Sequence, residues 1–148
     1  MDLPSGNDGY TLAVELRYLY VGSADTSRDV KAWLRVPGSK VVWRFRHFGA
    51  DVAAIDLGSS PLVVLADHRP VGSVLPIYAV ADLQASVAEL DGQGWHVEAA
   101  DFGTPDGPAA MLRASDGSDT DIALLRVDRP DAMPASFADP NNAHAVRS

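Results

Sequence analysis

Four histidines are the residues of this 148-residue chain best suited to chemistry near neutral pH, because imidazole titrates there and binds metals. His47 and His68 lie at or just beyond the ends of two strand-like runs, and Asp67 adjoins His68. His96 begins another such run and His144 is near the C-terminus, so neither has a predicted role. With no cysteine, disulfides and thiolate chemistry are excluded. No Ser/His/Asp signature or glycine-rich phosphate loop is present, and the sequence favours no nucleophilic mechanism.

The elements that must position these residues follow from the apolar pattern. Runs rich in β-branched and aromatic residues predict strands, and Asp25 and Asp82 each precede a run with helical spacing, as helix N-caps do. One strand, one helix and three strands occur in this order twice, with the caps 57 residues apart. An internal repeat of this kind indicates two copies of one folding unit. The predicted strands are Thr11–Val21, Lys40–Phe48, Val52–Leu57, Leu62–Ala66, Val74–Val80, Trp95–Ala100, Ala109–Ala114 and Thr120–Val127.

The repeat divides the chain into four parts. Residues 1–10 are polar and predict a flexible N-terminus, 11–70 form a first βαβββ module and 71–127 a second. Residues 128–148 contain three prolines and little periodic apolar content, which predicts a disordered tail without an element. In the second module, Ser115–Ser118 predicts a turn.

Composition and charge narrow the class of protein. The chain is 47% hydrophobic and 22% charged, which is normal for a globular domain. It has no apolar run of about 18 residues and no secretory signal pattern, so we expect a cytoplasmic protein that binds no membrane. A net charge of −8 repels phosphate backbones, so we expect no nucleic-acid partner.

Four short motifs occur in a fixed order along the chain: Leu19-Tyr20-Val21, Asp25 with Arg28 ahead of Trp33 and Gly38, Ile77 to Leu83, and Asp116 to Asp121. Together they resemble motifs of the vicinal oxygen chelate superfamily, which includes glyoxalase I, extradiol dioxygenases and the bleomycin-resistance proteins. The resemblance covers about Leu16 to Leu125. It implies an α+β, glyoxalase-like fold in which two tandem βαβββ modules form a curved, partly open barrel around a cleft.

The resemblance also implies where a metal would bind, because metal-dependent members place one ligand on the first and one on the last strand of each module. The equivalent positions here are Tyr18, Leu75, Asp121 and an aliphatic residue, Leu62 or Val64. A divalent ion needs at least three good oxygen or nitrogen donors, and these positions supply one carboxylate and one neutral phenol. We therefore expect no metal there and no cofactor. The weak metal candidates are His47, His68 and Asp121.

Without a metal, the implied cleft is apolar and aromatic. Side chains two residues apart on a strand share a face, so Tyr20 accompanies Tyr18 and Ile77 accompanies Leu75. The predicted ligand-binding residues are Tyr18, Tyr20, Trp43, Phe45, Leu75, Ile77 and Asp121.

Either face of the strand Lys40–Phe48 could line the cleft. We expect the face formed by Val41, Trp43, Phe45 and His47 to line the cleft, with Arg44 and Arg46 in solvent or on a charged rim. The alternative is that Trp43 and Phe45 pack under the helix as plain core.

These residues predict a protein similar in kind to the bleomycin-resistance proteins, which sequester a drug without altering it. An aromatic or cationic small molecule would stack on Tyr18, Tyr20 and Trp43 and pair with Asp121. The alternative is an enzyme of the same superfamily: a lyase, isomerase or dioxygenase with a divalent metal in an atypical ligand set, or a metal-free enzyme using Tyr18 or Asp121 in acid–base work. A third hypothesis is a domain that mainly pairs with another chain. Superfamily members usually dimerise, and we expect a homodimer.

Overall fold

The computed structural model describes residues 15–115 and 120–147 and divides the chain into two compact units. One unit contains Leu16–Pro76 and Pro130–Ser148 and holds the first βαβββ module, and the other is built on Ile77–Arg129 and holds the second module from the middle of its first strand onward. Each module has one helix and four strands of a mixed sheet, so the predicted α+β class with two βαβββ units is confirmed. The predicted flexible stretch 1–10 and most of the predicted turn at 115–118 lie outside the described residues.

The first module has the strand order β2-β3-β4-β1. Strands β1 and β4 are parallel, and β2–β3 and β3–β4 are antiparallel. A parallel pair needs a long crossover, and this crossover contains the helix α2, which packs on β3 and β4. The bounds are β1 Glu15–Gly22, α2 Thr26–Trp33, β2 Lys40–His47, β3 Ala50–Asp56 and β4 Leu62–Ala66.

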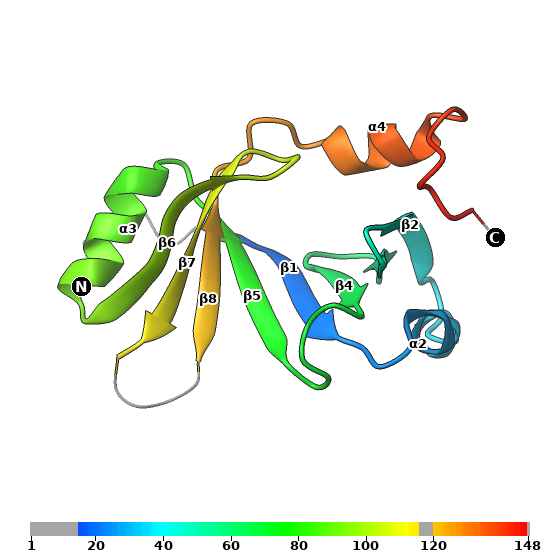
Figure 1. The fold of residues 1–148 in the computed structure, drawn as a ribbon, viewed down its shortest axis with the longest axis horizontal. Helices are drawn as coiled ribbons and strands as arrows, with labels where there is room; N and C mark the ends of the chain where they lie inside the picture. The colour runs from blue at the N-terminus through cyan, green and yellow to red at the C-terminus, as the bar shows by residue number, and fades with distance from the viewer. Residues whose placement is uncertain (1–14, 116–119, 148) are drawn as a thin grey trace. The chain divides into compact units, whose positions relative to one another are not determined.

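The second module repeats this arrangement with the strand order β5-β8-β7-β6. Strands β5 and β8 are parallel, and the other two pairs are antiparallel. In Figure 1, α3 lies beside β6 and β7, and it also packs on β8. The bounds are β5 Val74–Ala79, α3 Leu83–Gly92, β6 Trp95–Gly103, β7 Pro108–Ala114 and β8 Asp121–Leu125.

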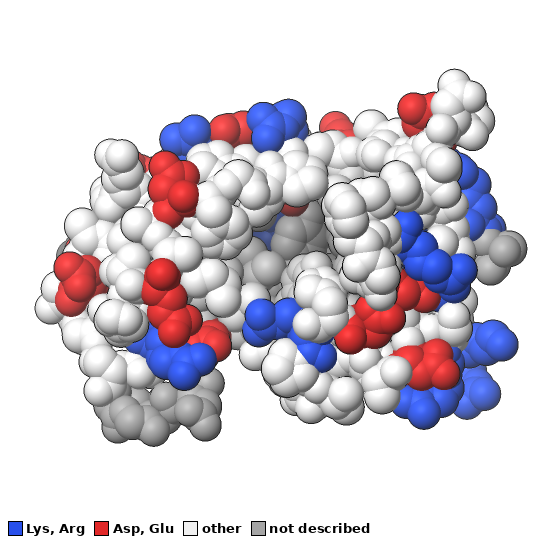
Figure 2. All heavy atoms as spheres, in the orientation of Figure 1, with Lys and Arg blue, Asp and Glu red and all other residues white. Residues whose placement is uncertain are grey.

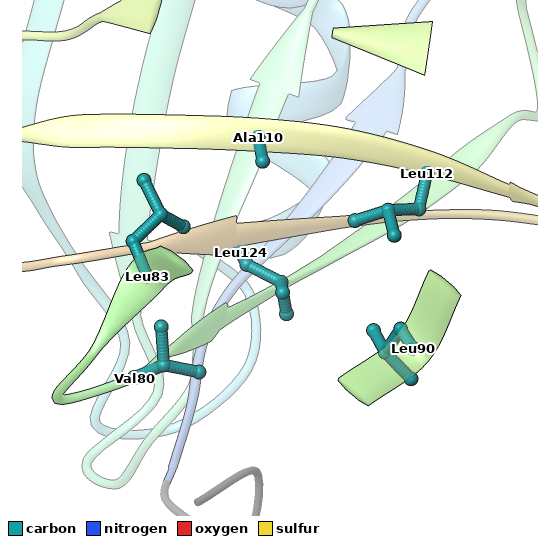
Figure 3. Packing of buried hydrophobic residues seen from close by; sticks show 6 residues of the cluster. All are labelled: Val80, Leu83, Leu90, Ala110, Leu112 and Leu124. Carbon is teal, nitrogen blue, oxygen red and sulfur yellow. The ribbon is translucent and has the colours of Figure 1, made fainter. Parts of the chain in front are cut away.

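Each helix has its own apolar core beneath it. Leu83 and Leu90 of α3 pack against Leu112 of β7 and Leu124 of β8, all 6% exposed or less (Figure 3). In the first module Val30 of α2 packs against alternate residues of β3 and β4, namely Ala53, Ile55, Val63 and Leu65. Burial of each large aliphatic side chain stabilises the fold by roughly 1.5–3 kcal/mol.

The C-terminal segment differs from the sequence prediction, because it contains an ordered helix, α4 (Ala132–Ala138), that packs on β2. Phe137 of α4 lies edge-on against Phe45, with ring centroids 6.1 Å apart. Beyond the helix the chain runs along β2, where the Arg46 N–H donates to the His144 carbonyl at 2.8 Å. The prediction of an element-free tail is therefore wrong. Pro134 lies in the first turn of α4, where a missing N–H is tolerated.

The surface carries charges of both signs, and Figure 2 shows acidic and basic side chains interspersed over the face that it draws. Several are paired, such as Arg113 with Glu98 at 3.3 Å and Arg126 with Asp128 at 3.0 Å. Within residues 15–115 and 120–147, no helix has the length and apolar character needed to cross a bilayer.

Candidate ligand-binding face

The sheet of the first module has one face turned away from α2, and the strand register arranges it in rows. Trp43 lies opposite Ala54, Ala54 opposite Val64, and Val64 opposite Tyr20. Residues paired across neighbouring strands share a face, so these four form one row, here called the Trp43–Tyr20 row. Three strand spacings separate its ends by about 14 Å. The row thus has a large aromatic side chain at each end and small side chains between them.

The next row on the same face contains Phe45, which lies opposite Val52. The rings of Trp43 and Phe45 are neighbours, with centroids 5.9 Å apart and planes 32° apart. Both face away from α2, so the alternative that they pack under this helix is wrong, although Trp43 is a buried core residue at 4% exposure. Phe45 instead packs against Phe137 of the C-terminal segment.

A β-bulge changes the predicted composition of this face. The register of β2 against β3 shifts between Val41 and Trp43, and the extra residue of a bulge reverses the alternation of side chains. Val41 consequently packs with the α2 core. The prediction that Val41 shares a face with Trp43 is therefore wrong. No local sequence pattern indicates the bulge.

Arg44 is also placed differently from the prediction, which put it in solvent or on a charged rim. Its side chain is buried and forms a bidentate ion pair with Asp51, from Nη2 to Oδ2 at 2.6 Å and from Nε to Oδ1 at 2.9 Å. The same Nη2 also donates to Ser27 Oγ at 2.8 Å. Burial raises the pKa of Asp51, but the hydrogen bond from Arg44 and the charges of Arg44 and Arg46 outweigh it, so the pKa lies below its ordinary value.

The other end of the Trp43–Tyr20 row meets the linker that follows β4. The His68 ring packs edge-on against Tyr20, with centroids 6.1 Å apart. Burial raises the pKa of the Tyr20 phenol, and the charge of Arg69 only partly opposes this. Tyr20 therefore stays protonated near neutral pH and can donate a hydrogen bond.

Two nitrogen donors near this face are buried and have no hydrogen-bond partner among the described residues: Trp43 Nε1 and Arg69 Nε. Trp43 as a whole residue is only 4% exposed. An unsatisfied buried donor costs about 1–3 kcal/mol, and native proteins rarely keep one without a reason. A ligand could reach these buried N–H groups only if the side chains that cover them move, because Trp43, Ala54 and Val64 are at most 4% exposed. Sequence reasoning did not identify either nitrogen as a donor.

The remaining predicted residues lie on the strands as follows. Tyr18 is opposite Leu62, which selects Leu62 over Val64 as its strand neighbour. Ile77 is opposite Ala123 in the second module. Asp121 already has a cation, since Arg113 donates to its two oxygens at 3.0 and 3.3 Å. Leu75 is buried at the start of β5.

These placements bear on a metal site. The superfamily positions offer the hydrocarbons Leu62 and Leu75, the phenol of Tyr18 and a carboxylate already paired with Arg113, so they do not fit a divalent ion. The weak candidates His68 and Asp121 contact Tyr20 and Arg113, respectively. Across the part of the chain that the structure describes, no group of three or more His, Asp or Glu could hold a metal.

A separate pocket of about 490 Å³ opens at the β2–β3 hairpin. Its walls contain positive and negative side chains and two imidazoles. The lining residues come from the hairpin, from the residue after β4 and from the C-terminal segment. The lining residues are Arg46, His47, Phe48, Gly49, Ala50, Asp51, Asp67 and His144. His144, to which the sequence assigned no role, meets His47 here, because the C-terminal segment lies along β2.

Comparison with known proteins shows the class of fold. No protein-family model and no curated protein matches the chain. Among solved structures, methylmalonyl-CoA epimerase from Mycobacterium tuberculosis is similar at a TM-score of 0.63 and 19% identity, covering 83% of this chain and 94% of that one. A hypothetical protein from Bacillus halodurans is similar at 0.65 and 9%, covering 78% and 95%.

A variant of Streptomyces coelicolor methylmalonyl-CoA epimerase in complex with 2-nitronate-propionyl-CoA is similar at a TM-score of 0.62 and 14% identity, covering 78% of this chain and 98% of that one. Methylmalonyl-CoA epimerase is a vicinal oxygen chelate protein, so the predicted glyoxalase-like fold is confirmed. At these identities the likeness shows the fold alone, and the fold serves many chemistries.

Proposed function

We propose that this chain is a vicinal oxygen chelate protein that binds a small aromatic molecule on the Trp43–Tyr20 row, without the metal of its enzymatic relatives. Support comes from the fold and from the two aromatic ends of the row. The single observation that carries the proposal is the buried Trp43 Nε1–H, which has no partner among the described residues. An acceptor atom on the ligand would satisfy it.

The charges favour an acceptor-bearing or anionic ligand over a cationic one. Trp43 Nε1 and Arg69 Nε are donors, and the protonated Tyr20 hydroxyl is a third. The carboxylate predicted to attract a cation, Asp121, is already ion-paired with Arg113, which Glu98 shares. A flat molecule with a carboxylate therefore suits this face better than a flat amine. Tyr18, Leu75, Ile77 and Asp121 remain predicted ligand-binding residues, and a cytoplasmic homodimer remains the expected form.

The experiment is a binding titration of the full chain with matched aromatic acids and amines, 1-naphthoate against 1-naphthylmethylamine and indole-3-acetate against tryptamine. We expect the acids to bind and to raise the melting temperature, since a ligand of the native state stabilises it. Trp43→Phe keeps an aromatic ring but removes the N–H, and we expect affinity for the acids to fall about tenfold. Trp95→Phe, in the second module, is the control and leaves affinity unchanged. Equal affinity of Trp43→Phe and the wild type would refute the proposed face.

An enzyme of the same superfamily is the competing function, and the names of the structural neighbours suggest the first substrate to try. A single epimer of methylmalonyl-CoA, incubated with the chain in the presence of Co²⁺ or Mg²⁺, would epimerise if this chain were an epimerase. We expect no epimerisation above background, because the superfamily metal positions here lack three donors. Epimerisation that depends on added metal would overturn the metal-free hypothesis.

A further inference from the structure

We propose that His47 and His144 form a binding site for a divalent transition metal such as Zn²⁺, which links the C-terminal segment to the β2–β3 hairpin. This site is separate from the four superfamily positions and does not depend on the proposed ligand face. Histidine nitrogen is a preferred ligand for Zn²⁺, Cu²⁺ and Ni²⁺.

The distance between the two imidazoles carries the proposal. His47 Nδ1 and His144 Nδ1 are 3.1 Å apart, which is hydrogen-bond distance, so one of the two nitrogens must give up its proton before both can bind one ion. Two nitrogens bound to one ion at about 2.0–2.1 Å, with an angle of about 100–109° between them, lie about 3.1–3.4 Å from each other. The ring centroids are 3.8 Å apart with planes at 57°. A shared ion would require the rings to rotate slightly apart, which two exposed side chains can do.

Both histidines are held in place by their backbones. His47 is the last residue of β2 and lies opposite Ala50 across the hairpin. The turn between them contains Phe48 at φ 50° and Gly49 at φ 77°, so it is a tight turn of fixed shape. The His144 carbonyl accepts from the Arg46 N–H at 2.8 Å, and the His144 N–H donates to Asn142 Oδ1 at 3.0 Å. Residues 97 positions apart are thereby brought together.

The charges around the site nearly balance, so the two imidazoles must supply the binding. The pocket at this site is lined by two carboxylates, Asp51 and Asp67, and by one guanidinium, Arg46. Asp51 is engaged by Arg44 and Arg46, and Asp67 Oδ1 accepts from the Asp51 N–H at 2.8 Å. No third protein ligand completes the site among the described residues. The two imidazoles are both good nitrogen donors, unlike the phenol and the Arg113-paired carboxylate at the superfamily positions, and water would supply the third and fourth donors. Such a site selects imidazole-preferring metals and excludes Mg²⁺, which prefers oxygen ligands.

The test is calorimetric titration of chelator-treated full-length protein with Zn²⁺, with Mg²⁺ as the negative ion. We expect one Zn²⁺ per chain and no Mg²⁺ binding. His47→Ala and His144→Ala should each lower Zn²⁺ affinity about tenfold or more, and the double variant should be no weaker than the weaker single variant. His68→Ala and His96→Ala replace the other two histidines of the chain and should bind as the wild type does.

A second measurement separates a shared site from two independent ones. The Arg46 and Val146 amides donate across the contact between β2 and the C-terminal segment, so bound Zn²⁺ should slow their hydrogen exchange. This slowing should vanish in His144→Ala. No Zn²⁺ binding, equal loss in the His68→Ala control, or binding without slower exchange would each overturn the proposal. Both side chains are exposed, so the metal-free variants should unfold at the wild-type temperature.

Discussion

Asp25 and Asp82 are the N-caps of α2 and α3, at equivalent positions in the two modules. Oδ1 of each accepts a hydrogen bond at 3.0 Å from the backbone N–H three residues later, that of Arg28 in α2 and of Ala85 in α3. The backbone of both is extended, with φ −153° and ψ 97° at Asp25 and φ −125° and ψ 102° at Asp82. The repeat visible in the sequence is therefore a repeat of helix-start geometry.

Removal of either cap should weaken its module. We expect Asp25→Ala and Asp82→Ala each to lower the free energy of unfolding in urea by about 1 kcal/mol, because an N–H at the helix start loses its partner. Asp25→Asn and Asp82→Asn keep a side-chain oxygen and should lose much less. Equal losses for Asn and Ala would contradict the capping role.

The buried Arg44–Asp51 pair should matter far more than an exposed pair. Asp51→Ala leaves the Arg44 charge buried without its partner and should cost about 3–5 kcal/mol of unfolding free energy. Asp121→Ala breaks the pair with Arg113, whose side chain is 44% exposed, and should cost less than about 1 kcal/mol. Denaturant titration of both variants checks this, and comparable losses would show that burial of the pair contributes nothing.

Asp51 should also make the fold sensitive to acid. Its pKa is lowered in the folded state, while an unfolded aspartate titrates at about 3.9. The contribution is therefore fully present above the unfolded pKa and is lost as the pH falls through the folded one. Unfolding free energy measured from pH 6 to pH 3 should fall more steeply in the wild type than in Asp51→Asn. Parallel curves would assign the acid sensitivity to other groups.

The contact between Phe45 and Phe137 should couple the C-terminal segment to β2. In a double-mutant cycle with Phe45→Leu and Phe137→Leu, we expect a coupling energy of about 0.5–1.5 kcal/mol from the edge-on aromatic pair. Phe45→Leu with Phe102→Leu, a residue of the second module, provides the comparison and should show no coupling. Coupling of the same size in both cycles would contradict a specific ring contact.

Two glycines should respond oppositely to alanine. A Cβ at Gly22 would lie 1.9 Å from the Pro70 carbonyl oxygen, so Gly22→Ala forces backbone apart and should cost about 3 kcal/mol. Gly92 ends α3 with no heavy atom within 4 Å of such a Cβ, and Gly92→Ala should raise stability by about 0.5 kcal/mol. Thermal unfolding of the two variants gives the comparison, and a neutral Gly22→Ala would refute the close approach.

The sequence by itself determined the local elements and their repetition. Leu62–Ala66 was predicted at its observed bounds, and Asp25 and Asp82 were predicted as caps, because alternation and capping act over a few residues. The fold class followed, since a repeated βαβββ order has few ways to bury its apolar faces. From residue types alone, the sequence also predicts that Tyr18, Leu75 and Asp121 hold no metal, and this stays a prediction.

Only the tertiary structure decided the rest. The bulge after Val41, the burial of Arg44 against Asp51 and the docking of Phe137 on Phe45 depend on how strands pair and on where the chain returns after the second module. His144 shows the reason most clearly: it meets His47 through backbone hydrogen bonds to β2, between residues about a hundred positions apart. Side-chain type and local spacing carry no record of such contacts, because any exposed strand edge can accept them.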